Sequence, residues 1–257
     1  MQIQREQSQD EVIQSLQCEN DALAAANHLL QEQLARKEQF IAMIAHEMRN
    51  PITPIITYAQ MMARPTSAPE TIQRGSKVIV GQARRLTRLA YDLLDASRLT
   101  SGHFTLVRRA CDIAELAKKM VEELRPLAPY HTLVIETPDT PVIGSWDSDR
   151  LQQALGNLLD NAIKYSDIHT TVTVRVETEQ HFAHISIHNQ GPGISAEDIG
   201  LLFQLYGRLQ ATSDREGSGL GLYITRNIVE AHGGILRLEP HILEGQGTTF
   251  SFDLPLY

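Results

Sequence analysis

Hydrophobic residues recur at heptad spacing from the beginning of the chain. In the notation abcdefg, residues 13, 20, 27, 34, 41 and 48 are a positions, and residues 16, 23, 30, 37 and 44 are d positions, where leucine predominates. Asn20 and Asn27 occupy a positions, and a buried asparagine there favours a parallel two-stranded coil in fixed register. We therefore expect residues 1–39 to form a coiled-coil helix. A single surface helix is the alternative, which its narrow hydrophobic seam disfavours.

The same pattern predicts that this helix continues to about Arg64. Its hydrophobic stripe is formed by Ile41, Ile44, Met48, Ile52 and Ile55. His46 lies off that stripe at an f position, which is the most exposed of the seven, and Glu47 follows it. Pro51 and Pro54 lack backbone donors, so we expect a kink or a loosened turn just after the histidine.

A second amphipathic helix is predicted after a turn at residues 65–69. Ser67 and Glu70 have the spacing of a capping box, with Pro69 in the first turn. A seven-residue hydrophobic repeat then extends to about Leu99. Residues 40–99 therefore predict an antiparallel helical hairpin, and two such hairpins would form a dimeric four-helix bundle.

The pattern changes after a linker at residues 100–106. Mixed helical and alternating periodicity predicts helices at 112–127, 147–165 and about 219–232, and strands at 132–136, 141–145, 171–178, 181–188, 234–239 and 248–254. Residues 191–217 show little periodicity apart from a short piece at 199–206. Residues 107–257 are therefore expected to form an α/β sandwich.

Composition narrows the possible functions. The net charge of −8 disfavours nucleic acid as the main partner. Cys18 and Cys111 are far apart and form no CxxC pattern, which disfavours a zinc site or a disulfide and favours a reducing compartment. No hydrophobic run reaches the ~18–20 residues of a membrane span. We therefore expect a soluble cytoplasmic chain, with a membrane anchor further upstream as the open alternative.

Two kinds of polar motif point to nucleotide chemistry. Asn157, Asn161 and Lys164 share one face of the helix predicted at 147–165, where amide oxygens could bind Mg²⁺ and the ammonium group a phosphate. Glycines follow the strand that ends at Asn189, open the helix predicted near 219, and precede Thr248. They stand at positions 191, 193, 217, 219, 221, 245 and 247. Glycines at a helix N-terminus form a phosphate cradle, and neither a Walker P-loop nor a Rossmann fingerprint is present.

The segment around His46 resembles the phosphoacceptor box of bacterial sensor histidine kinases. The matching residues are Phe40, Ala42, His46, Glu47, Arg49, Asn50 and Pro51. The asparagine and glycine motifs, in this order, resemble the N, G1, G2 and G3 boxes of the Bergerat ATP-binding fold. That fold is shared by histidine kinases, gyrase-type topoisomerases, mismatch-repair ATPases and a chaperone family. Residues 203–208 resemble the F box of the kinases specifically.

The resemblance implies ATP-dependent autophosphorylation of His46 in a homodimer, followed by transfer to an aspartate of a response-regulator receiver domain. It implies attack by Nε2, with Glu47 accepting a hydrogen bond from the other ring nitrogen, and a phosphatase role for Asn50. Asn157 and Asn161 would hold Mg²⁺. The implied ATP-binding residues are Asn157, Asn161, Lys164, Tyr165, Asn189, Gly191, Gly193, Ile194, Arg208, Arg215, Gly217, Gly219, Leu220, Gly221, Leu222 and Thr248.

One residue departs from the family pattern. The G1 box begins with aspartate, which accepts a hydrogen bond from the adenine amino group, and Asn189 stands here instead. An uncharged acceptor predicts ATP binding weaker by about tenfold. A signalling scaffold that binds nucleotide poorly is therefore an alternative. A plain ATPase is a third, which the helical hairpin disfavours.

Overall fold

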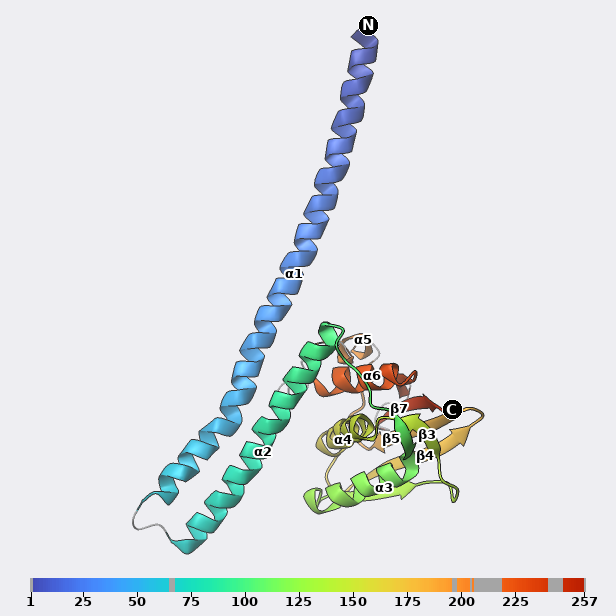
Figure 1. Cartoon of the computed structure of the whole chain (residues 1–257). Helices are drawn as coiled ribbons and strands as arrows, with labels where there is room; N and C mark the ends of the chain where they lie inside the picture. The colour runs from blue at the N-terminus through green and yellow to red at the C-terminus, as the bar shows by residue number, and fades with distance from the viewer. Residues whose placement is uncertain are drawn as a thin grey trace. The chain divides into compact units, whose positions relative to one another are not determined.

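A computed structural model describes residues 2–64, 68–195, 198–203, 205, 219–239 and 247–256 (Figure 1). Within these ranges the side chains of residues 2–15, 18, 36, 39 and 201 lie outside the description. The chain separates into two units, Met1–Thr53 and Pro54–Tyr257. The first contains most of one long helix. The second contains the end of that helix, a second helix and an α/β domain.

Helix α1, Gln2–Met62, is the long helix predicted from the heptads. Its helical assignment passes through Pro51 and Pro54 without interruption, and the kink expected there stays a prediction. Leucines of the predicted seam are 57–60% exposed at positions 16, 23, 30 and 34. No helix in the described part of the chain is both long enough and apolar enough to cross a membrane.

Helix α2, Pro69–Thr100, confirms the second predicted helix, but the predicted capping box is wrong. Ala68 is the N-cap, with φ −65° and ψ 146°, and makes no side-chain capping bond. Pro69 fixes this start, because its ring suits the first helical position and holds the preceding residue extended. Ser67 lies outside the described residues. A Cβ added to Gly75 would lie 2.6 Å from Sδ of Met62, so the beginning of α2 packs against the end of α1 in a hairpin.

A five-stranded sheet forms the centre of the α/β domain, in the order β2-β4-β5-β7-β6. Its strands are β2 Thr132–Glu136, β4 Thr171–Glu179, β5 Phe182–Asn189, β6 Ile235–Glu239 and β7 Thr248–Pro255. β2 runs parallel to β4, and the other neighbours are antiparallel. β1, Arg109–Asp112, pairs antiparallel with β3, Ile143–Trp146, in a separate small sheet.

Three helices pack on the hydrophobic face of the large sheet: α3 Ile113–Leu124, α4 Ser148–Tyr165 and α6 Gly221–Ala231. A short 3₁₀ turn, η1 Arg125–Leu127, follows α3, and a short helix, α5, spans Ile199–Leu202. Alternate residues of β4 and β5 are buried beneath the helices, while their neighbours on the other face are partly exposed. This alternation is typical of an antiparallel sheet with one solvated face, and it confirms the predicted α/β sandwich.

Helix starts in this domain follow local chemistry. Asp112 caps α3 by accepting from the backbone N–H of Ala114 at 3.0 Å, and Asp147 caps α4 by accepting from that of Arg150 at 3.2 Å. Both aspartates were predicted as helical residues and instead precede the helices. α6 begins at Gly221, later than predicted, because Gly219 has φ +67° and cannot belong to a right-handed helix.

Candidate functional site

The candidate phosphoacceptor His46 is exposed on α1, as its heptad position predicts. The amide nitrogen Nδ2 of Asn50 lies 3.4 Å from its ring nitrogen Nδ1. This contact follows from helix geometry, since side chains four residues apart face each other. Glu47 is only 5% exposed, and the hydrogen bond that it is expected to accept from the ring stays a prediction.

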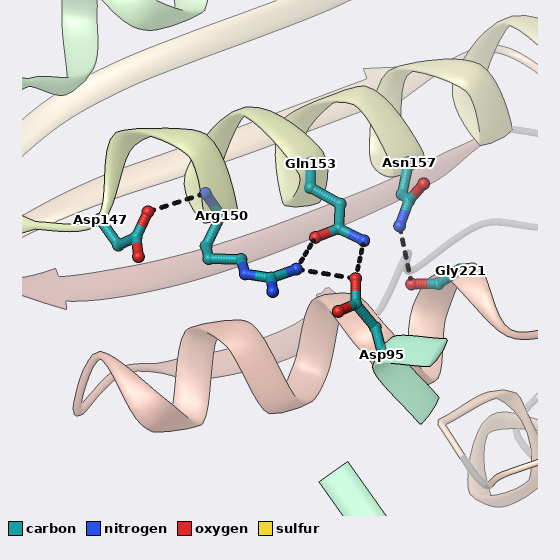
Figure 2. Close-up of polar contacts among 6 residues, drawn as sticks. All are labelled: Asp95, Asp147, Arg150, Gln153, Asn157 and Gly221. Atoms are coloured by element: carbon teal, nitrogen blue, oxygen red, sulfur yellow. Dashed lines mark hydrogen bonds and ion pairs between the residues drawn. The ribbon is translucent and has the colours of Figure 1, made fainter. Parts of the chain in front are cut away.

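The predicted polar face of α4 adjoins the beginning of α6. Asn157, Asn161 and Lys164 are all partly exposed on α4. The amide of Asn157 donates to the backbone carbonyl of Gly221 at 3.3 Å (Figure 2). A Cβ added to Gly221 would lie 3.6 Å from the side chain of Asn157, so the two helices approach closely here. The asparagine motif of α4 and Gly221 of the glycine motif are therefore adjacent in the fold.

The glycines of the G1 and G3 motifs allow close backbone approach at the end of β5. A Cβ on Gly191 would lie 2.3 Å from the carbonyl oxygen of Tyr165, and one on Gly247 would lie 1.9 Å from that of Asn189. Gly193 and Gly247 have φ values of +74° and +94°. Neither contact leaves room for a side chain, so these loops require glycine.

Asn189 is the most unusual polar residue in this region. Its side chain is 3% exposed, and its Nδ2 has no hydrogen-bond partner among the described residues. A buried donor without a partner costs about 1–3 kcal/mol. Such an atom commonly marks a ligand site, and its position beside Gly191 and Gly247 fits the base of a nucleotide.

Lys164 and Tyr165 interact with each other at the end of α4. Nζ of Lys164 donates to the hydroxyl of Tyr165 at 3.0 Å and lies 4.7 Å from the centre of its ring. Tyr165 therefore orients the ammonium group that was predicted to reach a phosphate.

The remaining predicted residues differ in their surroundings. Leu220 is fully buried, Thr248 is 8% exposed and pairs with Asn189 across β5 and β7, and Ile194 and Leu222 are partly exposed. Arg208, Arg215 and Gly217 lie outside the described residues. Among the described residues, no group of three or more histidine, cysteine or acidic side chains could hold a metal ion.

A polar cluster that the sequence did not indicate joins α2 to α4 (Figure 2). Asp95, which is 5% exposed, accepts from Arg150 at 2.7 Å and from Gln153 at 2.8 Å. The Arg150 guanidinium also lies 5.0 Å from the centre of the Phe104 ring, in the predicted linker. The partners are more than fifty positions apart, so no local pattern could reveal them.

Two more charged residues of α2 belong to the same contact. Arg88 forms an ion pair with Asp160 of α4. Burial raises the pKa of Asp92 to about 6, and nearby Asp95 adds to this effect while Arg88 opposes it. Helix α2 therefore contacts the α/β domain through a partly buried set of charges.

The buried side chain of His232 holds the residue that precedes α4. Nε2 of His232 accepts from the backbone N–H of Asp147 at 3.0 Å, so Nδ1 carries the proton and donates to the carbonyl of Ile228 at 2.7 Å. Burial lowers the pKa of His232, which keeps the ring neutral. Asp147 also accepts from the backbone N–H of Val107 at 2.7 Å, which attaches the end of the linker to the same point.

Comparison with known proteins matches both halves of the chain. The family described as "His Kinase A (phospho-acceptor) domain" matches residues 36–102. The family described as "Histidine kinase-, DNA gyrase B-, and HSP90-like ATPase" matches residues 146–257. These ranges contain the exposed histidine and the glycine-lined site, respectively.

Individual sensor histidine kinases are also similar to this chain. The chain is 30% identical over 225 residues to the sensor histidine kinase WalK of Bacillus subtilis, which covers 85% of this chain and 36% of WalK. The structure of the mycobacterial sensor histidine kinase MprB is 32% identical, with a TM-score of 0.52, over 58% of this chain and 97% of that one. The structure of the histidine kinase ThkA in complex with the response regulator protein TrrA is 25% identical, with a TM-score of 0.61, over 88% of this chain and 64% of that one.

The chain spans 34% to 62% of the length of curated relatives of this kind. The matches nevertheless cover both the helical hairpin and the ATPase fold, in the same order. The chain belongs to the family of two-component sensor histidine kinases.

Proposed function

We propose that this chain phosphorylates His46 with ATP and passes the phosphoryl group to an aspartate of a response-regulator receiver domain. The observation that carries this proposal is the presence, in one chain, of an exposed histidine paired with Asn50 and a Bergerat-type fold with a buried unpartnered amide at Asn189. The first supplies a nucleophile and the second a nucleotide site. The matched kinase relatives support the same assignment.

The nucleophile requires a defined tautomer. Nε2 of His46 has a free lone pair only when the neutral ring carries its proton on Nδ1. The amide of Asn50 lies 3.4 Å from Nδ1. Rotating the Asn50 amide by a half-turn exchanges its nitrogen and oxygen and places Oδ1 toward Nδ1 of His46. Asn50 then accepts a hydrogen bond from Nδ1–H and holds the reactive tautomer.

Glu47 has a separate role in this proposal. Its buried carboxylate stabilises the positive charge that the His46 ring develops when Nε2 bonds to phosphorus. In a separate phosphatase reaction, the amide of Asn50 orients a water that hydrolyses the aspartyl phosphate of the regulator and releases inorganic phosphate. The same side chain thereby serves both reactions from one position on α1.

The nucleotide would be held by residues from three segments. Mg²⁺–ATP, when bound, supplies the phosphoryl group and an in-line leaving group. Asn157 and Asn161 offer amide oxygens to the metal ion, and Lys164, oriented by Tyr165, offers its charge to a phosphate. Arg208 and Arg215, which lie outside the described residues, would add positive charge. Asn189 would contact the base.

The exposed leucines of α1 and one related structure indicate two partners, a second copy of the chain and a response regulator. Leu16, Leu23, Leu30 and Leu34 are 57–60% exposed along α1 in the single chain. A helix of 61 residues with such a seam is expected to pair with a second copy, so we propose a homodimer with a four-helix bundle. The complex of ThkA with TrrA supports a response regulator as the second partner.

Radiolabelling tests this function. The chain is incubated with [γ-³²P]ATP and Mg²⁺, and the product is then mixed with a receiver domain. We expect a label on the chain that is labile in acid and stable in base, and its transfer to the receiver. Phosphate release without labelling would indicate a plain ATPase. Labelling only in Asn189→Asp would indicate a scaffold that binds nucleotide too weakly, and either result contradicts the proposal.

A further inference from the structure

The unpartnered amide of Asn189 carries a further inference about the nucleotide base, which rests on the proposed nucleotide site. Asn189 ends β5 on the side of the sheet that the helices cover, and it is 3% exposed. Its Nδ2 has no hydrogen-bond partner among the described residues. A buried donor with no acceptor is unfavourable unless something bound at the site supplies one.

Two glycines lie beside Asn189. A Cβ built on Gly191 would lie 3.2 Å from Nδ2 of Asn189 and 2.3 Å from the carbonyl of Tyr165. Gly247 approaches the backbone of Asn189 so closely that its Cβ would lie 1.9 Å from the carbonyl oxygen. Gly191 therefore leaves space beside the amide that a side chain would fill, and Gly247 does the same beside the backbone of Asn189, which is typical of a site where a ligand approaches closely.

The chemistry of an amide differs from that of the carboxylate found here in the family. A carboxylate only accepts hydrogen bonds, whereas an amide both donates and accepts. The six-membered edge of adenine offers the N6 amino donor beside the N1 acceptor. A 6-oxopurine offers the O6 acceptor beside the N1–H donor. A half-turn of the amide complements either edge. A carboxylate that contacts the substituent at position 6 accepts from the amino group of adenine but opposes the O6 acceptor of a 6-oxopurine.

We infer that Asn189 makes this site permissive for the purine base, so that it binds adenine and 6-oxopurine nucleoside triphosphates with similar affinity. In both cases Nδ2 gains an acceptor: N1 of adenine or O6 of the 6-oxopurine. An aspartate at the same position would select adenine. The cost of this permissiveness is the loss of the charge-assisted bond to the adenine amino group.

Inosine nucleotides test the inference most cleanly, because hypoxanthine has O6 and N1–H without the 2-amino group of guanine. Calorimetry compares the β,γ-imido analogues of ATP and ITP, with Mg²⁺, on the parent chain. We expect the ratio of the two Kd values to be within about fivefold, since each base makes two neutral hydrogen bonds to the amide. This measurement needs no substitution, so a folding defect cannot obscure it.

Two variants then separate the amide from general charge effects. Asn189→Asp should tighten the adenosine analogue by about tenfold and weaken the inosine analogue by at least tenfold, which raises the ratio by about a hundredfold. Gln190→Glu adds the same charge at the neighbouring, exposed position and should leave the ratio unchanged. Circular dichroism and thermal melting confirm that both variants are folded.

The outcomes distinguish the two proposals. Adenosine binding with more than about thirtyfold discrimination against inosine in the parent would overturn this inference and leave the proposed kinase function intact. An unchanged ratio in folded Asn189→Asp would do the same. Absence of binding by either analogue to the parent and to Asn189→Asp would overturn the nucleotide site itself, and this inference with it.

Discussion

Replacing Gly191 by alanine should damage the nucleotide site through one added methyl group. The new Cβ would lie 2.3 Å from the carbonyl oxygen of Tyr165, whereas ordinary contact begins near 3.4 Å. The loop after β5 would have to move by about 1 Å, because the carbonyl of Tyr165 that it would clash with is backbone and cannot rotate away as a side chain could. That movement displaces the carbonyl of Gln190, which accepts from Oγ of Ser166 at 3.0 Å and from the backbone N–H of Asp167 at 2.7 Å.

The magnitude follows from those two hydrogen bonds. Each contributes about 1 kcal/mol, so a variant whose loop is displaced by the clash loses about 2 kcal/mol of folding stability. Nucleotide binding must then restore the native loop against the clash, and a similar cost of about 2 kcal/mol would raise the apparent Kd by about thirtyfold. The melting temperature should fall by roughly 4–8 °C. Calorimetry with the ATP analogue and a thermal melt measure the two effects on the same sample.

Gly81→Ala is the control for this substitution. Gly81 lies within α2, and a Cβ there would have no heavy atom within 4 Å. Alanine in a helix interior is favoured over glycine by about 0.5–1 kcal/mol, so this variant should be slightly more stable and bind nucleotide as the parent does. Parent-like affinity and melting temperature in Gly191→Ala would refute the steric reasoning.

Two further predictions concern the contacts around α4. Because the pKa of His232 is lowered in the folded chain, the unfolded chain takes up a proton near pH 6.5 that the folded chain does not. The free energy of unfolding should therefore fall as the pH drops below 6.5. Urea titrations should show a smaller fall for His232→Gln than for the parent. Asp95→Ala removes the partner of Arg150, whose side chain is 23% exposed, and should destabilise the contact by about 1–2 kcal/mol. Limited proteolysis should therefore cleave the linker near Phe104 faster than in the parent, while Asp149→Ala, at an exposed position, should match the parent. Equal cleavage rates for Asp95→Ala and the parent would contradict the role of the cluster.

Long, strongly periodic elements could be predicted from the sequence. The heptads indicate α1 and α2, and the alternation at 132–136 gives β2 with the observed bounds, because burial on one face imposes these periods directly. β1 was missed because four residues, two of them exposed, carry no such signal. The beginnings of α2 and α6 were displaced by Pro69 and Gly219, whose backbone preferences override the side-chain pattern.

The site was predictable in its motifs but not in its pairings. Asn157 was singled out for its spacing, yet its bond to Gly221 depends on how α4 packs against α6. The contact of Asn50 with His46 was not predicted, although the two residues lie one helical turn apart. Contacts between residues distant in sequence, such as Asp95 with Arg150, are set by tertiary packing and leave no local pattern.

The most direct test of the central claim is the position of the phosphoryl group. The parent, His46→Gln and His28→Gln are incubated with [γ-³²P]ATP and Mg²⁺. His28 is a second exposed histidine of α1, with a side chain that is 74% exposed, so its variant is a matched control. We expect acid-labile label in the parent and in His28→Gln, and none in His46→Gln. Acid-labile label that persists in His46→Gln would contradict the central claim.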